Sequence, residues 1–555
     1  MAERRLSLGL DYGTNSVRAL LVDVDTGEEA GSHVAEYRTG DHGVWLDPKN
    51  PHLARQHPQD YLDGLFESAS GALSQAGARP EQVIGIGVDT TGSTPIPVDG
   101  SGVPLALSDE HRSDLNAMAW LWKDHTSHDE AAEITLLCQM RGEPYLNKCG
   151  GAYSSEWFWS KALHCERTAP NVFAKAHSWV ELCDFIPAYL AGSLSPKTIK
   201  RSACAAGHKA MFHSEWGGLP SVEFLAALSP GLARLRGSLY NEVFASDTVA
   251  GCLDAEIADR CGLQAGTPIA VGGFDAHFGA VGSGVKSGRL VKIIGTSTCD
   301  IMVAPMDGTV SDIPGICGVA EHSVLPGMLG LEAGQSAVGD IFNWFVQQIC
   351  GDSDGAQTHA RLSSEAAGLA PGESGLLALD WNNGNRSILT DPRLSGLLLG
   401  QTLATSPCEI YRALIEATAF GALRIIERLE EYGVKIEEIV ACGGIAEKSP
   451  LLMQIYADVC NRPMQVSASP QTCALGAAIF GAVAGGAHQT VESAQHAMVR
   501  KPEKRYEPNQ KANAVYAQLY LLYRRLHDAF GVSGTQLDLS ATMKRLLEIR
   551  EMSRQ

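Results

Sequence analysis

Short apolar runs alternate with turns rich in glycine and hydroxyl residues in the first hundred residues of the chain. Residues 6–10 and 17–23 are predicted strands, and the turn between them reads Asp11-Tyr12-Gly13-Thr14-Asn15-Ser16. A second pair of strands is expected at 82–88 and 94–98, on either side of Asp89-Thr90-Thr91-Gly92-Ser93. Strands of this length, joined by tight turns, indicate that the chain begins with a sheet.

The pattern then becomes helical and aromatic from about residue 104 to residue 218. Most of the tryptophans of the chain lie in this stretch: Trp120, Trp122, Trp157, Trp159, Trp179 and Trp216. An aromatic ring can stack on a sugar or fill a core, and for each single residue core filling is the expectation. We therefore predict a helical insertion with its own hydrophobic core.

A new β-rich stretch is predicted from about residue 267. Strands are expected at 268–271, 290–294, 300–304, 436–441 and 464–468, and helices at 409–431, 449–460 and 474–485. The strands at 290–294 and 300–304 flank Gly295-Thr296-Ser297-Thr298-Cys299, which resembles the first turn of the chain. The same strand–turn–strand pattern in both halves predicts a duplicated α/β domain with a cleft between the copies. From about residue 502 the chain is charged and helical.

Composition and charge narrow the class of protein. The chain has 555 residues, of which 45% are hydrophobic and 19% are charged, as in ordinary globular proteins. A net charge of −19 argues against nucleic acid as the main partner. The 14 cysteines form no Cys-x-x-Cys pair, which favours free thiols, a reducing compartment and no zinc site. We find no signal-peptide pattern and no apolar stretch long enough to span a membrane, so a cytoplasmic protein is expected.

The two glycine turns are candidates for binding phosphate. Glycine lets backbone N–H groups approach an anion, and the hydroxyls of Thr14, Thr296, Ser297 and Thr298 add further donors. Asp11 precedes the first turn, where its carboxylate could hold Mg²⁺. Each turn alone could be an ordinary hairpin, but two of them at matching strand ends favour a phosphate clamp.

A third turn, Gly443-Gly444, lies between a strand and a helix and could admit an adenosine group. The sequence lacks both the Walker pattern and a Gly-x-Gly-x-x-Gly fingerprint after a strand, so neither a P-loop nor a dinucleotide fold is predicted.

Three charged residues are candidates for sugar chemistry. Asp275 follows two glycines at a strand end, where its carboxylate could accept a proton from a substrate hydroxyl or cap a helix. Lys209 and Glu332 could bind sugar hydroxyls, although surface or capping roles are the default for such side chains.

Seven blocks of sequence, in this order, resemble the FGGY carbohydrate kinases over residues 6 to about 490. They begin with Leu8-Gly9-Leu10-Asp11-Tyr12-Gly13-Thr14-Asn15-Ser16-Val17-Arg18. The others lie at 87–95, 122–126, 153–159, 206–209, 294–300 and 330–336. The resemblance implies two actin-like or hexokinase-like ATPase domains, each with a ribonuclease H-like core. It divides the chain into a sugar-binding domain at 1–284 with the insertion at 104–218, a nucleotide-binding domain at 285–500 and a helical tail at 501–555.

The resemblance is strongest to members that phosphorylate L-ribulose, and it implies transfer of phosphate from Mg-ATP to this sugar, giving L-ribulose 5-phosphate. Kinases of D-ribulose, D-xylulose or a polyol are the close alternatives, and a non-catalytic actin-like ATP clamp is the remote one. The implied partners are a small sugar and ATP, without nucleic acid or membrane. The tail is a candidate surface for pairing two copies in a homodimer.

Carried over residue by residue, the resemblance implies one set of roles. Asp275 is the expected catalytic base, and Asp11 and Asp275 are the expected metal ligands. The expected sugar ligands are Gly92, Lys209, Asp275 and Glu332. The expected nucleotide ligands are Gly13, Thr14, Asn15, Gly295, Thr296, Ser297, Thr298, Gly443, Gly444 and Lys448.

Overall fold

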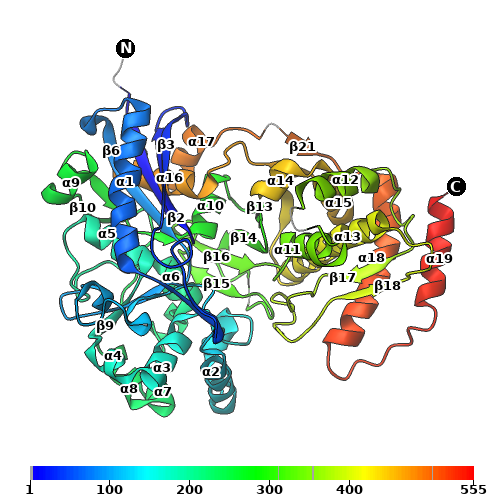
Figure 1. Ribbon diagram of the computed structural model, residues 1–555, viewed down its shortest axis with the longest axis horizontal. Helices are drawn as coiled ribbons and strands as arrows, with labels where there is room; N and C mark the ends of the chain where they lie inside the picture. The colour runs from blue at the N-terminus through cyan, green and yellow to red at the C-terminus, as the bar shows by residue number, and fades with distance from the viewer. Residues whose placement is uncertain (1–3, 311, 353–354, 503, 555) are drawn as a thin grey trace.

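The computed structural model describes residues 4–310, 312–352, 355–502 and 504–554. Two large mixed sheets dominate this part of the chain (Figure 1). The first sheet has the order β10 (Val249–Cys252), β11 (Pro268–Ala270), β6 (Val83–Thr90), β1 (Leu6–Tyr12), β2 (Ser16–Asp23) and β3 (Glu29–Glu36), with β12 (Gly273–Phe274) also paired to β6. The second has the order β15 (Gly318–Glu321), β16 (Met328–Ala333), β14 (Thr298–Pro305), β13 (Gly288–Ile294), β19 (Ile436–Cys442), β20 (Met464–Val466) and β21 (Lys504–Tyr506).

The two sheets share one topology. In the first, β3, β2 and β1 are antiparallel neighbours, and β6 and β11 then continue the sheet in parallel with β1. In the second, β16, β14 and β13 are antiparallel, and β19 and β20 continue in parallel with β13. The same strand order in both halves confirms the predicted duplication of an α/β domain.

Helices from both halves of the chain meet between the sheets. Helix α16 (Thr472–Ala484) packs on β1 and β6 of the first sheet and also against α10 (Asp275–Gly282), which contacts β13 and β14 of the second. Glycines make this close approach possible: a Cβ atom on Gly9 or Gly87 would lie 1.9 or 1.8 Å from a carbonyl oxygen of α16. The division at residues 284 and 285 stays a prediction, because part of the second half covers the first sheet.

The remaining helices pack on the sheets, within the aromatic insertion or on one another. Helix α1 (Pro58–Ala76) packs on β2 and β3. The others of the N-terminal half are α2 (His128–Arg141), α3 (Phe158–Thr168), α4 (Pro170–Lys175), α5 (Leu182–Leu190), α6 (Ala203–Lys209), α7 (Val222–Leu228), α8 (Pro230–Arg236) and α9 (Ala255–Cys261). Those of the C-terminal half are α11 (Gly339–Trp344), α12 (Ala356–Ala367), α13 (Pro407–Glu431), α14 (Gly444–Lys448), α15 (Pro450–Cys460), α17 (Val491–Met498), α18 (Gln510–Gly531) and α19 (Thr542–Ser553).

The aromatic insertion has a core of its own, as its composition predicts. Trp120, Trp159 and Trp179 are fully buried in it, so these rings fill the core.

One strand pairing differs from the prediction. The strand β7 (Pro95–Val98) does not pair with β6 but runs antiparallel to β9 (Ser178–Glu181), because the turn after β6 directs the chain away from the first sheet into the insertion. Short strands β4 (Trp45–Asp47), β5 (Asn50–Gln56) and β8 (Ala119–Trp120) form another small sheet.

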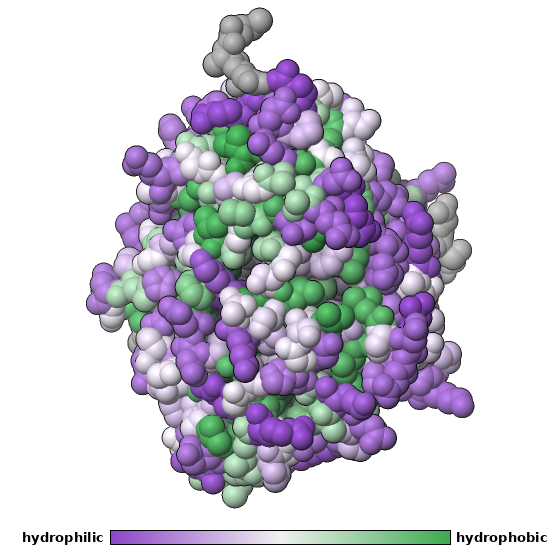
Figure 2. All heavy atoms as spheres, turned by 90° about the vertical axis from the view of Figure 1, so that its left-hand side faces the viewer, coloured by the Kyte–Doolittle hydropathy of each residue, from purple (hydrophilic) through white to green (hydrophobic). Residues whose placement is uncertain are grey.

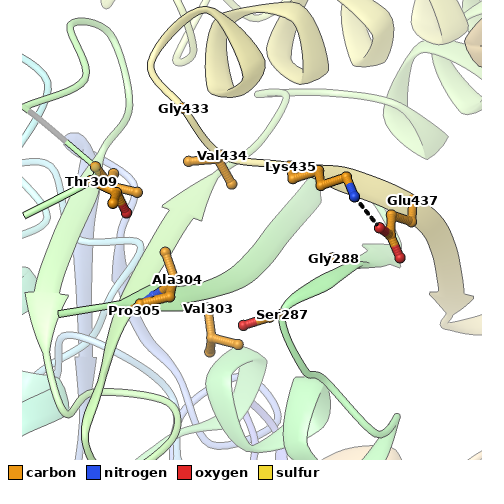
Figure 3. A pocket seen from close by; sticks show the side chains of 11 residues that line it. Ser287, Gly288, Val303, Ala304, Pro305, Thr309, Gly433, Val434, Lys435 and Glu437 are labelled. Atoms are coloured by element: carbon orange, nitrogen blue, oxygen red, sulfur yellow. Dashed lines mark ion pairs between the residues drawn. The ribbon is translucent and has the colours of Figure 1, made fainter. Parts of the chain in front are cut away.

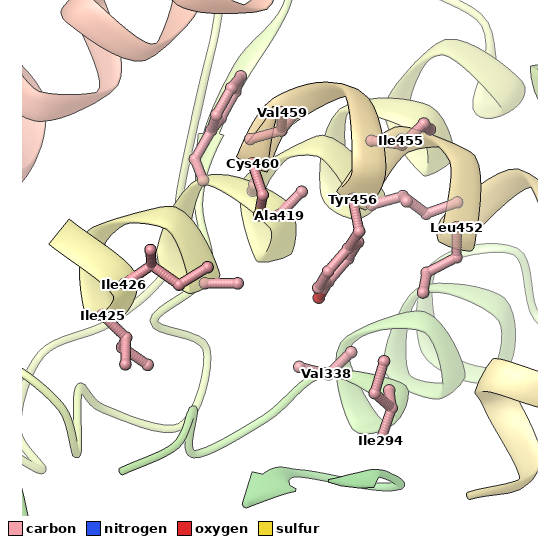
Figure 4. Packing of buried hydrophobic residues seen from close by; sticks show 14 of the residues in the cluster. Ile294, Val338, Ala419, Ile425, Ile426, Leu452, Ile455, Tyr456, Val459 and Cys460 are labelled. Atoms are coloured by element: carbon pink, nitrogen blue, oxygen red, sulfur yellow. The ribbon is translucent and has the colours of Figure 1, made fainter. Parts of the chain in front are cut away.

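The second half is built around α13 and α15. Figure 4 shows Tyr456 of α15 beside Ala419 of α13, with Val338 below them. The predicted helical tail also contributes a strand, since β21 pairs with β20 before α18 begins. Tyr516, Tyr520 and Tyr523 of α18 pack around Phe420. The tail is therefore an integral part of the second core. A short sheet of β17 (Leu377–Leu379) and β18 (Leu397–Leu399) lies beside it.

On the face shown in Figure 2, hydrophobic residues form separate patches between hydrophilic ones. Among the residues that the structure describes, no helix has the length and apolar character that crossing a membrane requires.

Candidate active site

The two glycine turns occupy equivalent places in the two sheets. In the first, the amide of Gly13 donates to the carbonyl of Ser16 at 2.9 Å and closes the hairpin of β1 and β2. In the second, the amide of Gly295 donates to the carbonyl of Ser297, also at 2.9 Å, and closes the hairpin of β13 and β14. The two turns therefore close hairpins at equivalent places but differ in size, since the Gly13 amide binds a carbonyl three residues further on and the Gly295 amide one two residues further on.

Hydrogen bonds from elsewhere in the chain hold the first turn. The indole of Trp122 donates to Oγ1 of Thr14 at 3.0 Å, and Nε2 of Gln56 donates to the Thr14 carbonyl at 2.6 Å. Nδ2 of the Asn15 side chain donates to the His42 carbonyl at 2.8 Å. This hydrogen bond holds the Asn15 side chain, although the residue is exposed to solvent.

The second turn is tied to the start of α11 and to the strand β16. The carbonyl of Thr296 accepts hydrogen bonds from the amides of Val338 at 2.8 Å and Asp340 at 3.2 Å. Oγ1 of Thr298 accepts one from the amide of Gln335 at 2.9 Å. The exposed Thr296 and partly buried Ser297 are left facing outward.

The third turn lies beside the second. Strand β19 runs parallel to β13 with Cys442 opposite Ile293, so Gly443 follows directly at the strand end. Gly443 has φ of 94°, and a Cβ atom there would lie 2.5 Å from the carbonyl oxygen of Ile294. Both facts require glycine at this position. Gly444 begins α14, and Lys448 ends that helix with its side chain exposed.

Three carboxylates meet where β1, β6 and β12 end. Asp11 lies opposite Asp89 in the parallel pair of β1 and β6, and Gly273 of β12 lies opposite Asp89 on the other side. Oxygens of Asp11 and Asp89 and the thiol of Cys473 all lie within 4.8 Å of one another. Asp275 follows β12. We call Asp11, Asp89 and Asp275 the carboxylate cluster.

Electrostatics in the carboxylate cluster favour bound protons or a cation. Burial raises the pKa of Asp11, although Arg18 at 3.8 Å opposes this effect. Burial and the charges of Asp11 and Asp275 raise the pKa of Asp89. Burial, and then the charge of Asp11, raise the pKa of Asp275 to about 7. Asp89 is not among the predicted site residues, although its position at the end of a predicted strand was a usable signal.

The alternative role of Asp275 as a helix cap can be compared with its geometry. The N-cap of α10 is Phe274, and Asp275 is the first residue of the helix. Its carboxylate accepts one hydrogen bond, from the amide of Ala276 at 2.7 Å. A capping side chain binds an amide two or three residues further on, so Asp275 does not cap the helix in that way.

Lys209 and Glu332 form a buried ion pair, which excludes the default surface role for both. Nζ of Lys209, on α6, lies 3.1 and 3.0 Å from the two carboxylate oxygens of Glu332, on β16. Burial alone would raise the pKa of Glu332, but Lys209 and then His208 and His277 lower it to a net value below the ordinary range. Burial lowers the pKa of Lys209, but Glu332, Cys317 and Glu156 together raise it to a net value above the ordinary range.

Gly92 lies next to the residue that precedes Asp275. A Cβ atom on Gly92 would lie 2.5 Å from the ring of Phe274, so no side chain fits there. The Lys209 ammonium lies 5.9 Å from the centre of the same ring and 5.4 Å from that of Trp157. The structure thus gathers Gly92, Lys209, Asp275 and Glu332 around Phe274.

Several residues near this site were not predicted. Nζ of Lys161 donates to the carbonyl of Ser93 at 2.9 Å, and the carboxylate of Glu181 accepts from the Ser93 hydroxyl and, at 2.8 Å, from the amide of Thr94. Arg386 donates to the Thr298 carbonyl at 2.5 Å. These partners are 68 to 88 residues apart in the chain, so no local pattern indicates them.

A separate cavity of about 310 Å³ lies on the second half (Figure 3). It lies between the start of β13, the end of β14 and the loop before β19, and an ion pair of 2.6 Å joins Lys435 to Glu437 at its edge. None of the predicted site residues lines it.

Comparison with known proteins agrees with this geometry. Residues 6–282 match the N-terminal domain, and residues 290–485 the C-terminal domain, of the FGGY family of carbohydrate kinases. A ribulokinase of Vibrio parahaemolyticus is 44% identical over 539 residues, covering 94% of this chain and 95% of that protein. A ribulokinase of Mycolicibacterium smegmatis is 39% identical over 561 residues, covering 98% and 97%.

Solved structures show the same fold. The xylulose kinase of Rhodospirillum rubrum superposes with a TM-score of 0.79 at 24% identity, over 97% of this chain and all of that one. The glycerol kinase of Plasmodium falciparum with ADP superposes with a TM-score of 0.75 at 14% identity, over 96% and 99%. Together with the two matched domains, which span most of the sequence, these likenesses lead to one conclusion: the chain belongs to the FGGY family of carbohydrate kinases.

Proposed function

We propose that this kinase transfers the terminal phosphate of ATP to L-ribulose and releases L-ribulose 5-phosphate in the cytoplasm. The observation that carries the proposal is the buried Lys209–Glu332 pair, which lies beside Asp275 in a chain whose relatives of nearly full length are ribulokinases. A buried ammonium and carboxylate offer donors and acceptors together, and sugar hydroxyls need both.

In this mechanism Asp275 accepts the proton of the terminal sugar hydroxyl. A pKa of about 7 allows the carboxylate to take up a proton near neutral pH. Asp275 belongs to the carboxylate cluster and also interacts with the charges of Glu332 and Lys209, so a base there would serve both sets of ligands. Lys209, Glu332 and the open backbone at Gly92 would orient the sugar toward it.

The carboxylate cluster fits a Mg²⁺ ion. Apart from the neighbouring carboxylate of Asp11, neither carboxylate oxygen of Asp89 has a hydrogen-bond partner among the described residues, although the side chain is fully buried. Carboxylate oxygens are the ligands that Mg²⁺ prefers, and the Cys473 thiol is too soft to compete. We expect Asp11 and Asp275, joined by Asp89, to hold the ion directly or through water. The bound ion would supply positive charge to the phosphate oxygens.

The turns would bind the nucleotide. Gly13, Thr14 and Asn15 from the first half, and Gly295 to Thr298 from the second, offer backbone amides and hydroxyls to the phosphate chain. Gly443, Gly444 and Lys448 would line the adenosine site beside the second turn. On this proposal, residues 1–284 bind the sugar and residues 285–500 the nucleotide. We also propose a homodimer, which size-exclusion chromatography with light scattering would test.

The test of the proposed function is an assay of ADP release with Mg-ATP and a panel of L-ribulose, D-ribulose, L-xylulose, D-xylulose, ribitol and glycerol. The highest kcat/KM is expected for L-ribulose. If another pentulose or polyol is preferred, the sugar assignment is wrong while the kinase assignment stands. ATP hydrolysis that no sugar stimulates would instead point to an ATP clamp and contradict both.

A further inference from the structure

Two histidines lie beside Glu332, and neither belongs to the predicted site. His277 is on α10, two residues after Asp275, and His208 is on α6, directly before Lys209. Both side chains are only 2% exposed. Nδ1 of His208 lies 3.4 Å, and Nε2 of His277 3.6 Å, from the same oxygen of Glu332, and the ring centres are 4.4 Å apart.

One ring nitrogen of His208 is already paired within the protein. Its Nε2 lies 2.9 Å from the hydroxyl oxygen of Ser323, which also lies 3.1 Å from the carbonyl oxygen of Ala320. Nδ1 is the nitrogen that faces Glu332. That atom has no hydrogen-bond partner among the described residues.

The ring of His277 is more exceptional, because neither of its nitrogens has a hydrogen-bond partner in the described part of the chain. One nitrogen of a neutral imidazole is a donor and the other an acceptor. Buried polar atoms are nearly always paired in native proteins, and leaving them unpaired is costly. The ring of His277 therefore has one unused donor and one unused acceptor.

A divalent metal ion is a poor candidate for the site formed by His208, His277 and Glu332. Two imidazoles and a carboxylate are zinc ligands by type, and their ligand atoms all lie within 4.8 Å of one another. However, the ammonium of Lys209 lies 3.0 Å from the same Glu332 oxygen and already neutralises its charge. A metal ion there would face a like charge at contact distance. A neutral hydroxyl avoids this repulsion and satisfies the ring.

We propose that His277 is a further sugar-binding residue, whose ring hydrogen-bonds a hydroxyl of the acceptor sugar next to Glu332. This inference rests on the proposed function, because it requires that the residues around Phe274 receive a sugar. It adds to the Lys209–Glu332 pair a third polar contact, supplied by the same helix that begins with Asp275.

Steady-state kinetics of His277→Phe test the proposal, because phenylalanine keeps the ring and removes both nitrogens. We expect KM for L-ribulose to rise about ten-fold, the effect of one lost hydrogen bond to a buried group, while KM for Mg-ATP changes less than about two-fold. His277→Gln places an amide near the position of Nε2, and we expect its KM for the sugar to stay within about three-fold of the wild-type value. A sugar KM unchanged in folded His277→Phe, or equal rises for both substrates, would overturn the proposal.

His527→Phe is the matched control, since His527 is 3% exposed and also has an unpaired Nε2 but lies on α18 against Trp381. We expect its sugar KM to equal the wild-type value, and a rise matching that of His277→Phe would contradict the proposal.

The panel of sugars, tested with the wild-type enzyme, separates the L-ribulose assignment from the role of His277. If the wild-type enzyme prefers another pentulose, the L-ribulose assignment falls and the same comparison with that sugar decides the role of His277. If the wild-type enzyme phosphorylates no sugar, both proposals fall.

Discussion

At the residue scale, Asp275 combines a raised pKa with a place at the first turn of α10. If it is the base, Asp275→Asn keeps the shape of the side chain and removes only its ability to take a proton. We expect kcat to fall by about 10²- to 10⁴-fold, while the Kd for L-ribulose measured by calorimetry stays nearly unchanged. Asp254→Asn, at the N-cap of α9, is the matched control because asparagine also caps helices well. Wild-type-like turnover of Asp275→Asn would remove the base from the mechanism.

The Lys209–Glu332 pair makes a prediction about stability and pH. The pKa of Glu332 in the folded protein lies below its ordinary value of 4.5, so the pair contributes stability above about pH 4.5 and loses it as the pH falls through the lowered pKa. Glu332→Gln leaves the Lys209 ammonium buried without a counter-charge. We expect a loss of about 3–5 kcal/mol in the free energy of unfolding at pH 7 and a weaker decline below pH 4.5.

Urea unfolding between pH 3 and pH 7 measures both effects of Glu332→Gln. The double variant Lys209→Met/Glu332→Gln removes both charges and is expected to recover part of the lost stability. If Glu332→Gln is as stable as the wild-type protein and follows the same pH curve, the ion pair does not stabilise the fold.

The sequence could predict only those site residues whose role follows from their immediate neighbours in the chain. Asp11, Gly13 and Gly295 lie at strand ends, so local pattern alone marked them as candidates. Lys161 and His277 gave no such signal, because their meaning comes from contacts with Ser93 and Glu332, which are distant in the chain. A lysine in an amphipathic helix is usually solvated, and only the fold reveals that Lys161 is buried.

At the scale of elements, the seam between α16 and the first sheet depends on glycine. On Gly87 of β6, a Cβ atom would lie 1.8 Å from the carbonyl oxygen of Ala477 and 2.6 Å from its carbon, both backbone atoms that cannot rotate away. Gly87→Ala must therefore push the helix from the sheet. We expect the free energy of unfolding to fall by at least about 3 kcal/mol, measured by chemical unfolding.

The matched control for the seam is Gly100→Ala. Gly100 lies in an exposed turn, and the nearest atom to a Cβ there would be 4.0 Å away, in His177. We expect its stability to lie within about 0.5 kcal/mol of the wild-type value. Equal stability of the two variants would mean that α16 and β6 can separate without a loss of stability.

The hydrophobic pattern predicted α16 as a helix and β6 as a strand, but their contact joins residues about 390 positions apart, beyond what any periodicity can indicate.

At the scale of the whole molecule, the duplicated sheets are not independent of each other. The first sheet is formed by residues of the N-terminal half, yet the helix that covers β1 and β6 belongs to the C-terminal half. Ser7 of β1 donates a hydrogen bond of 2.6 Å to the Ala478 carbonyl of α16, and His488 is bonded to the Val24 carbonyl at 2.8 Å. A cut between the two halves would therefore expose an apolar sheet face.

This arrangement predicts that the fragment 1–284 does not fold alone. Without α16, the glycine-lined face of β1 and β6 has no cover, and the apolar area that it would bury is lost. We expect the isolated fragment to lack a cooperative thermal transition by circular dichroism and to regain one when mixed with the fragment 285–555. A fragment 1–284 that melts cooperatively by itself would show that the first sheet is stable without α16. In that case the boundary at residue 284 would separate two autonomous domains, and the shared layer of helices would serve only to set their relative orientation.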